Sequence, residues 1–300
     1  MKLSHLRDVL AVAEHGSLRG AARALGSVQP GITRSIREIE HELGITLFER
    51  HAKGVRLTDM GRVFLRRAEA VNAQVRRARE EIDQLKGRMT GEVSVALSPA
   101  SIISVLPGAV ASFRQLYPDA VLNIHESFLH PIERDLLSGA IDFYVGPIDP
   151  RADTNLLSVE HLFSKHNLIV ARRGHPLAGA TRLEQLVDAH WIRPSLSPQA
   201  AEGDLDDMFT GAGLPPPHFV INARSTLVTM LTIADSDLLT VVPQQWLDRP
   251  MIAGLVTALD IQPPAAAPIV IVQRPDLPLT PIAERLCDLM RQIGRGYERR

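Results

Sequence analysis

The chain has 300 residues, of which 45% are hydrophobic and 22% charged, a composition typical of a globular protein of about two domains and not of a disordered chain. Its one cysteine, Cys287, excludes a disulfide framework and any metal site built from cysteines, and predicts a cytoplasmic location. Charged residues such as Arg7 and Asp8 near the start argue against a signal peptide. The uncharged stretch 93–113 contains five serines and two prolines, which favours a strand, a loop and a helix over a membrane span.

The net charge of −1 conceals an uneven distribution along the chain. Residues 1–90 carry a net charge of +6, whereas residues 91–300 carry −7. A basic segment joined to an acidic remainder predicts a module that binds a polyanion such as nucleic acid, attached to a separate body. Charge alone leaves open a chance imbalance in an arginine-rich sequence.

Three short helices are predicted within the first 43 residues. Apolar residues repeat at helical spacing from Leu3 to Ala13, and Ser17 is positioned to cap a second helix over 18–25 that Gly26 ends in a left-handed turn. A third helix opens at Gln29-Pro30, because proline suits a first turn. Two short helices joined by a tight turn with glycine indicate a helix-turn-helix, whose later helix lies in the major groove of DNA.

Candidate DNA contacts lie on the polar face of this third helix, opposite its isoleucines, and in a basic hairpin around Gly54, called the wing below. We expect Gln29 to read adenine and Arg34 to read guanine through paired hydrogen bonds, while the cations of the wing hold phosphate. The alternative is that Arg34 and Arg37 pair with Glu38 or with neighbours of His41 on a solvated face. The candidate DNA-binding residues are Gln29, Pro30, Thr33, Arg34, Arg37, Arg50, Lys53 and Arg56.

A single long helix is predicted from Asp59 to about Lys86, with Thr58 as its N-cap. Its apolar residues alternate steps of four and three over three heptads, which is typical of a coiled-coil seam. We expect a second copy of the chain to cover this seam; the alternative is a helix packed on its own domain. The candidate dimerisation residues are Phe64, Val71, Val75, Ala78, Ile82 and Leu85.

The N-terminal segment resembles the LysR-type transcriptional regulators, which implies a winged helix-turn-helix followed by a dimerising linker helix. Two positions depart from the family pattern: Val28 stands where serine is usual, and Gly31 stands where alanine is usual. Both departures put individual DNA contacts in question. The matching positions are Gly16-Ser17-Leu18, Ala21-Ala22, Leu25, Gln29-Pro30, Ile36, Glu40, Leu43-Gly44, Leu47-Phe48, Arg50, Leu57-Thr58 and Gly61.

The remainder of the chain alternates apolar strands with helices, which predicts an α/β fold with right-handed parallel sheets. A first series has strands over 92–97, 120–125 and 141–146, and a second series begins at Leu168–Ala171. Thr181 to Glu184 reads as a capping box for a helix of the second series. Later strands are expected around Trp191, Phe219–Ile221, Leu238–Val242 and Ile269–Gln273, and a last helix begins at Thr280-Pro281.

The resemblance to LysR-type regulators extends over this body and implies an effector domain like a periplasmic binding protein, with two Rossmann-like lobes crossed by two chain segments. It implies a winged helix-turn-helix at 1–58, a linker helix at 59–88, lobe I at 91–162 and 268–300, and lobe II at 163–267. It also implies a homodimer or homotetramer and contact with RNA polymerase. One departure is the acidic loop 234–237, where the family usually has a turn containing glycine. The matching landmarks are Leu106-Pro107, Pro118, Gly139, Ile141-Asp142, His175-Pro176-Leu177 and Pro243.

An effector site is expected where loops lead from the carboxyl ends of the strands into helices. Hydroxyls and free backbone N–H groups at helix starts favour a small organic anion such as a carboxylate. Arg193 and Arg224 are each close in sequence to one of these loops and are available to add charge or to face solvent. Val105, Phe128 and Leu129 are available for an apolar wall. The alternative is that the serines are helix caps and nothing more. The candidate effector-binding residues are Ser98, Pro99, Ala100, Ser101, Gly146, Pro147, Ser195, Ser197, Ser225 and Thr226.

No pattern in the sequence indicates an enzyme, a cofactor or a metal. His130 follows His125 by five positions, whereas a zinc-binding HExxH helix requires four. The predicted function is therefore a ligand-responsive regulator that binds promoter DNA and changes the geometry of its oligomer when the effector binds. Two alternatives are a cytosolic solute-binding module with a fused oligomerisation helix and an architectural DNA-binding protein; the helix-turn-helix disfavours the first, and the acidic body disfavours the second.

Overall fold

The computed structural model describes residues 1–51, 54–149, 154–164, 166–194, 205–223, 225–262 and 266–298. The chain divides into two compact units: residues 1–88 with 137–140, and residues 89–136 with 141–300. We describe each unit by itself. Within the described residues, no helix is both long enough and apolar enough to cross a membrane.

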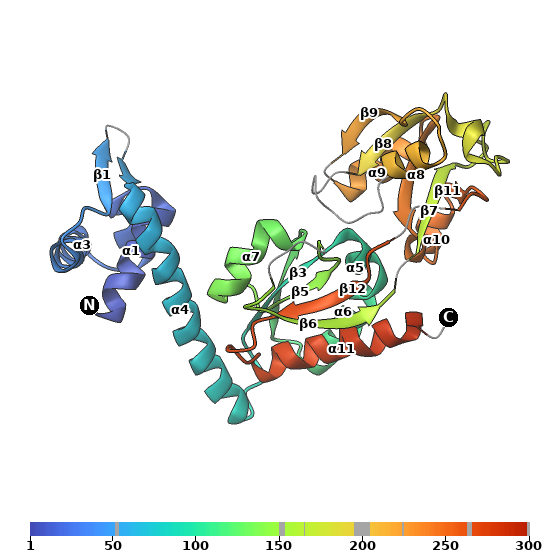
Figure 1. Cartoon of the computed structure of the whole chain (residues 1–300). Coiled ribbons are helices and arrows are strands. Elements are labelled where there is room, and N and C mark those ends of the chain that lie inside the picture. The colour runs from blue at the N-terminus through green and yellow to red at the C-terminus, as the bar shows by residue number, and fades with distance from the viewer. Residues whose placement is uncertain are drawn as a thin grey trace. The chain divides into compact units, whose positions relative to one another are not determined.

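The N-terminal unit has the predicted order of helices, hairpin and long helix (Figure 1). Local capping agrees with the sequence: the Ser17 side chain accepts from the amide of Gly20, and Gly16, Gly26 and Gly44 all have left-handed backbone angles. The second helix ends one residue earlier than predicted, because Leu25 is already its non-helical cap. The elements are α1 (Leu3–His15), α2 (Leu18–Ala24), α3 (Gln29–Leu43), β1 (Phe48–His51), β2 (Gly54–Leu57) and α4 (Asp59–Leu85).

The wing is fastened to the helices by backbone contacts. Strands β1 and β2 pair antiparallel, and the amide of Val55 donates to the carbonyl of Gly16. A Cβ on Gly54 would lie 2.3 Å from that carbonyl oxygen, and its φ of +139° is one that other residues rarely adopt. Gly54 is therefore required where the wing meets the turn after α1.

The first part of the long α4 helix packs within its own unit. Ala68 is buried, and Phe64 packs on the same core as α1, α2 and α3. Val71, Ile82 and Leu85 are 41%, 52% and 75% exposed in the single chain. Phe64 is half-buried against the helix-turn-helix core, so that core covers part of the side chain, and its place in a dimer interface stays a prediction.

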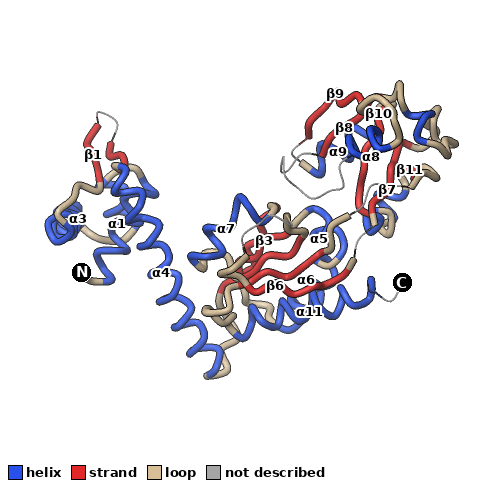
Figure 2. Tube along the Cα trace, in the orientation of Figure 1, coloured by secondary structure: helices blue, strands red, loops and turns tan. Residues whose placement is uncertain are grey.

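The first sheet of the second unit, whose strands are red in Figure 2, has the strand order β4-β3-β5-β12-β6. Strand β3 pairs parallel with β4 and β5, as predicted for the first series, while β12 runs antiparallel to β5 and β6. The single helix expected after β3 is two helices that meet at Val105. The elements are β3 (Glu92–Leu97), α5 (Pro99–Ser104), α6 (Leu106–Leu116), β4 (Val121–Glu126), α7 (Leu129–Ser138), β5 (Phe143–Gly146), β6 (Ser158–Phe163), β12 (Ile269–Gln273) and α11 (Pro281–Glu298).

The second sheet has the order β11-β7-β10-β8-β9 and is only partly parallel. Its bounds are β7 (Asn167–Arg172), η1 (Leu183–Leu186), β8 (His190–Pro194), α8 (Leu205–Gly211), β9 (His218–Ala223), α9 (Thr226–Ala234), β10 (Leu238–Pro243), η2 (Gln244–Trp246), α10 (Pro250–Ala253) and β11 (Val256–Ala258). Strand β7 is antiparallel to β10 and β11, so the prediction that it opens a parallel series is wrong. Its predecessor β6 belongs to the other sheet, and the preference for a parallel crossover applies only within one sheet.

The helix predicted from the capping box at Thr181 is a single 3₁₀ turn. The side chain of Gln185, not that of Glu184, accepts from the amides of Thr181 and Arg182. The box therefore forms one residue later than predicted and caps a short turn, η1.

Candidate DNA-binding helix and effector cavity

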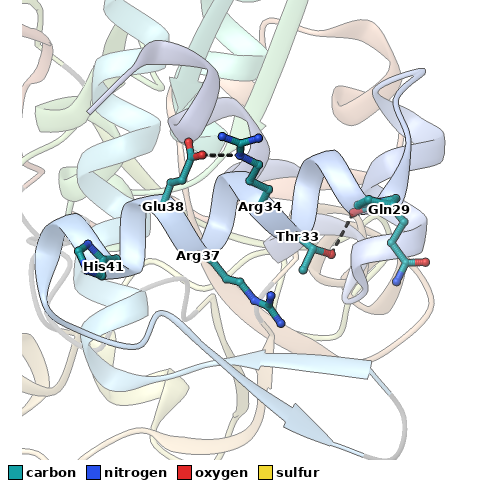
Figure 3. A pocket seen from close by; sticks show the side chains of 7 residues that line it. Gln29, Thr33, Arg34, Arg37, Glu38 and His41 are labelled. Carbon is teal, nitrogen blue, oxygen red and sulfur yellow. Dashed lines mark hydrogen bonds and ion pairs between the residues drawn. The ribbon is translucent and has the colours of Figure 1, made fainter.

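One face of α3 is buried and the opposite face is open. Ile32, Ile36 and Ile39 are buried in the core, as their spacing predicts. On the outside, a shallow hollow follows the helix (Figure 3) and is lined by Gln29, Pro30, Thr33, Arg34, Arg37, Glu38 and His41. The five α3 residues proposed for DNA binding thus lie together on one exposed surface.

Arg34 already has a partner on its own helix. Its Nε donates to Oε1 of Glu38 at 2.7 Å, and this hydrogen bond lowers the pKa of Glu38. In Figure 3 this pair points to one side of α3, whereas Thr33 and Arg37 point to the other. The alternative given for Arg34, pairing with Glu38 on a solvated face, therefore describes the free chain. The bond uses Nε and leaves the donors of the two terminal nitrogens available.

Arg37 and Arg56 are exposed cations with no partner within the part of the chain that the structure describes. Arg56 lies on β2 opposite Glu49 of β1. The side chain of Arg50 and the whole of Lys53 lie outside the described residues. The hydroxyl of Thr33 donates to the carbonyl of Gln29, which leaves its oxygen able to accept.

A cavity in the second unit gathers residues from the carboxyl ends of strands in both sheets. It is lined by Ser98, Pro99, Ala100, Phe128, Pro147, Pro194, Ala223, Ser225, Thr226, Thr229, Val241, Pro243 and Trp246. Six of the ten predicted effector-binding residues are among them: Ser98, Pro99, Ala100, Pro147, Ser225 and Thr226. The cavity volume is about 30 Å³, which is room for one or two water molecules, so an organic ligand needs the walls to separate.

The other predicted residues have different positions. Ser101 is completely buried and its hydroxyl bonds to that of Ser98 at 3.0 Å, so it supports the wall from behind. Gly146 has a packing role, because a Cβ there would lie 2.1 Å from the hydroxyl of Tyr144. Ser195 and Ser197 lie outside the described residues, as does Arg224.

Arg193, considered as a source of positive charge, is engaged elsewhere. Its guanidinium bonds to the carboxylate of Asp206 at 2.6 Å and stacks on the ring of Phe219 at 3.8 Å from the centroid. The described lining of the cavity contains no cation, and the Thr226 hydroxyl donates to the carboxylate of Glu126. The described walls therefore supply hydroxyls and apolar surface but no countercharge for an anion.

The serines of the cavity do act as helix caps. Ser98 accepts from the amide of Ser101, and Ser225 accepts from that of Val228. Sequence reasoning missed Trp246, the largest side chain of the wall. Its only signal was an aromatic residue three positions after the landmark Pro243, which is too common a pattern to single out.

The segment that follows Trp246 is bonded to the end of α5. Arg249, three residues further on, donates from Nε to the carbonyl of Ile103 at 2.8 Å and from a terminal nitrogen to that of Ser104 at 3.0 Å. These carbonyls lie at the end of α5, whose first residues line the cavity. The short helix α5 thus lines the cavity at its start and accepts the two Arg249 hydrogen bonds, called the clamp below, at its end.

Known proteins match both units. Residues 86–295 match the family model of the LysR substrate binding domain, and residues 3–62 match that of the bacterial regulatory helix-turn-helix protein, lysR family. The chain belongs to the LysR family of transcriptional regulators. As a member of that family it is a ligand-responsive DNA-binding regulator of transcription, and not an enzyme.

Relatives cover most or all of the chain. HTH-type transcriptional regulator GbpR of Azospirillum brasilense is 28% identical over 80% of this chain and 71% of its own length. PcaQ of Agrobacterium fabrum is 26% identical over 99% of this chain and 97% of its own length.

Among solved structures, CbnR, a LysR family transcriptional regulator, has a TM-score of 0.72 at 21% identity and covers 98% of this chain and 99% of its own. CbnR complexed with its target DNA has a TM-score of 0.72 at 22% identity over 98% and 100%. At these identities the structural likeness shows a shared fold.

Proposed function

We propose that the exposed face of α3 reads promoter DNA through Gln29, Thr33, Arg34 and Arg37, and that Arg50, Lys53 and Arg56 of the wing hold phosphate. Support comes from the separation of the two faces of α3: isoleucines inside, hydrogen-bonding side chains and cations outside. An α-helix with such a face fits the major groove. Arg37 is free to contact DNA at once, whereas Arg34 contacts it beside the negative charge of Glu38, to which its Nε is bonded.

We propose further that Val71, Val75, Ala78, Ile82 and Leu85 of α4 pair with the same face of a second copy. The exposure of Val71, Ile82 and Leu85 supports this, because an apolar seam at heptad spacing is stable only when covered. A dimer places two recognition helices on half-sites related by a two-fold axis. Tetramer formation and contact with RNA polymerase rest on family membership alone.

The proposed effector is a small organic molecule held in the cavity between the strand ends of the two sheets. The single observation that carries this proposal is that helix starts far apart in sequence, at Ser98 and Ser225, line one cavity with Phe128 and Trp246. Binding separates the walls, shifts the population of the two lobes and changes the geometry of the promoter-bound oligomer.

The charge of the effector stays a prediction. Free amides at the helix starts favour an anion, while Glu126 beside Thr226 opposes one. An acid with a largely apolar body suits walls made of prolines, Phe128 and Trp246 better than a sugar does.

The test is thermal denaturation of the full chain against a set of small carboxylates and their neutral amides. A ligand present at 100 times its dissociation constant raises the free energy of unfolding by about 2.7 kcal/mol. Ser98→Ala and Thr226→Ala should reduce this shift and leave DNA affinity without ligand unchanged. Ser158→Ala, on the exposed side of β6, is the matched control. If both cavity variants respond as the parent does, the effector binds elsewhere.

A further inference from the structure

Trp246 has a buried donor that nothing in the described part of the chain satisfies. The residue is 4% exposed, it lines the cavity, and its indole N–H has no hydrogen-bond partner there. Buried polar groups in proteins nearly always have a partner, because an unmet donor loses its bond to water and gains nothing in exchange. The N–H of Trp191 is also unmet within the described residues, but that residue lies in the core of the second sheet and does not line the cavity. Trp246 differs because it lines the cavity, where a ligand that separates the walls is able to supply the acceptor.

The hydroxyls of the same wall are already engaged. Thr226 donates to Glu126, Thr229 donates to the carbonyl of Ser225, and Ser98 bonds to the hydroxyl of Ser101. Using one of these groups for a ligand requires breaking a bond inside the protein. The indole N–H of Trp246 gains a bond without that loss, so it discriminates most strongly between ligands with and without an acceptor.

We infer that the indole N–H of Trp246 is the specificity-determining donor of the effector cavity, and that the effector places an acceptor oxygen of a carbonyl or carboxylate against it. This inference rests on the proposed effector site and names the chemistry which that site selects. The rest of the ligand is apolar, since Phe128, Val241, Pro243 and the Trp246 ring form the neighbouring wall. The donor is uncharged and binds neutral carbonyls as well as carboxylates.

The position of Trp246 also connects ligand binding to the clamp at α5. Its carbonyl accepts from the amide of Arg249, whose guanidinium holds the carbonyls of Ile103 and Ser104. A ligand that enlarges the cavity of about 30 Å³ at Trp246 therefore acts three residues from Arg249, which joins this turn to α5.

The direct test follows the indole N–H by nuclear magnetic resonance in the full chain labelled with ¹⁵N-tryptophan. There are two tryptophans, and Trp191 is completely buried in the core of the second sheet, so it serves as an internal control. The indole resonance that is absent from the spectrum of Trp246→Phe is assigned to Trp246. The probes are acetate, acetamide, benzoate and benzamide at millimolar concentration, with toluene as the probe lacking an acceptor.

We expect at least one acceptor-bearing probe to shift the Trp246 resonance downfield and to leave that of Trp191 in place, while toluene produces no downfield shift. Trp246→Phe, which keeps an aromatic ring without the N–H, should bind the active probe about tenfold more weakly. The inference is overturned if none of the four acceptors shifts the resonance, or if Trp246→Phe keeps the parent's affinity.

The outcome also separates this inference from the proposed site. If Thr226→Ala abolishes ligand stabilisation and Trp246→Phe does not, the cavity holds the effector and Trp246 is not its donor. If neither variant alters stabilisation by a ligand that binds, both the site and the role of Trp246 are wrong. Because the resonance shifts are measured on the parent chain, they still test the role of Trp246 if Trp246→Phe folds poorly.

Discussion

The hydroxyl of Thr226, the first residue of α9, donates to the carboxylate of Glu126, the last residue of β4, at 2.6 Å. The two residues are 100 positions apart and belong to parts of the fold built on different sheets. Thr226 also lines the cavity, so a negative charge lies one hydrogen bond from the wall. Substitution of Glu126 therefore tests whether the effector is negatively charged.

Replacing Glu126 by glutamine should strengthen the binding of an anionic ligand. The amide keeps an oxygen that accepts from Thr226 but removes the repulsion between two negative charges, worth roughly 1 kcal/mol near the surface, or about fivefold in affinity. Isothermal calorimetry with a carboxylate and with its neutral amide measures the effect, which should be confined to the carboxylate. Glu184→Gln, exposed and distant in the fold, is the control. Equal changes for both ligands would mean that Glu126 acts through shape and not through charge.

Releasing Arg34 from Glu38 should change DNA binding in a way that salt titration detects. In Glu38→Ala the guanidinium of Arg34 is free before DNA binds, and a negative charge is removed from the interface. DNA affinity should therefore rise, and the slope of log affinity against log salt concentration should become steeper by about one. Glu14→Ala, exposed on α1, supplies the same change of charge away from α3. An equal rise in affinity in both variants would mean that net charge, and not the release of Arg34, is responsible.

The roles of the two arginine sites are separated by substituting each with alanine. Arg34→Ala should relax the preference for guanine by about 1–3 kcal/mol, whereas Arg56→Ala should weaken binding to all sequences by a similar factor. Gel shifts on the parent operator and on single-base variants distinguish the two patterns. The reverse result would exchange the roles assigned to α3 and to the wing.

The exposed seam of α4 should hold the dimer. Val71→Asp combined with Ile82→Asp places two carboxylates per chain in an apolar interface, which should weaken the dimer by several kcal/mol. Both positions are exposed in the single chain, so the substitutions should change its own stability little. Sedimentation at micromolar concentration should show monomers. Asn72→Asp introduces one carboxylate beside the seam and should remain a dimer. A fully dimeric Val71→Asp/Ile82→Asp protein would place the interface elsewhere.

Cys287 should be unreactive in the folded protein. Burial raises the pKa of its thiol from the usual 9 to about 12, so almost no thiolate is present at pH 8. A thiol reagent should label the chain only after unfolding. Because the unfolded thiol ionises first, it binds fewer protons between pH 9 and 12, and this group lowers the free energy of unfolding as pH rises through that range. Rapid labelling of native protein at pH 8 would contradict this burial.

Several elements governed by neighbours in sequence were predicted correctly, whereas the capping box at Thr181 was not. Ser17 and Thr58 cap helices, and Gly26 turns left-handed, because each effect depends on a few adjacent residues. Strand β12 has the predicted bounds, since a run of β-branched residues suits a buried strand. The starts of α5 and α9 were placed in the effector site by the general position of ligands at strand ends, and the structure gathers them.

Tertiary structure alone decided the direction of β7, the division of the α4 seam and the part played by Trp246. Strand direction depends on which sheet the preceding strand joins, and the cover of Phe64 depends on how α4 packs against the helix-turn-helix core. The unmet N–H of Trp246 exists only because packing removes it from water without supplying an acceptor. The sequence by itself determined the caps, the amphipathic faces and the family, because these follow from local spacing; contacts between distant residues depend on the whole fold, since many side chains are compatible with the same local pattern.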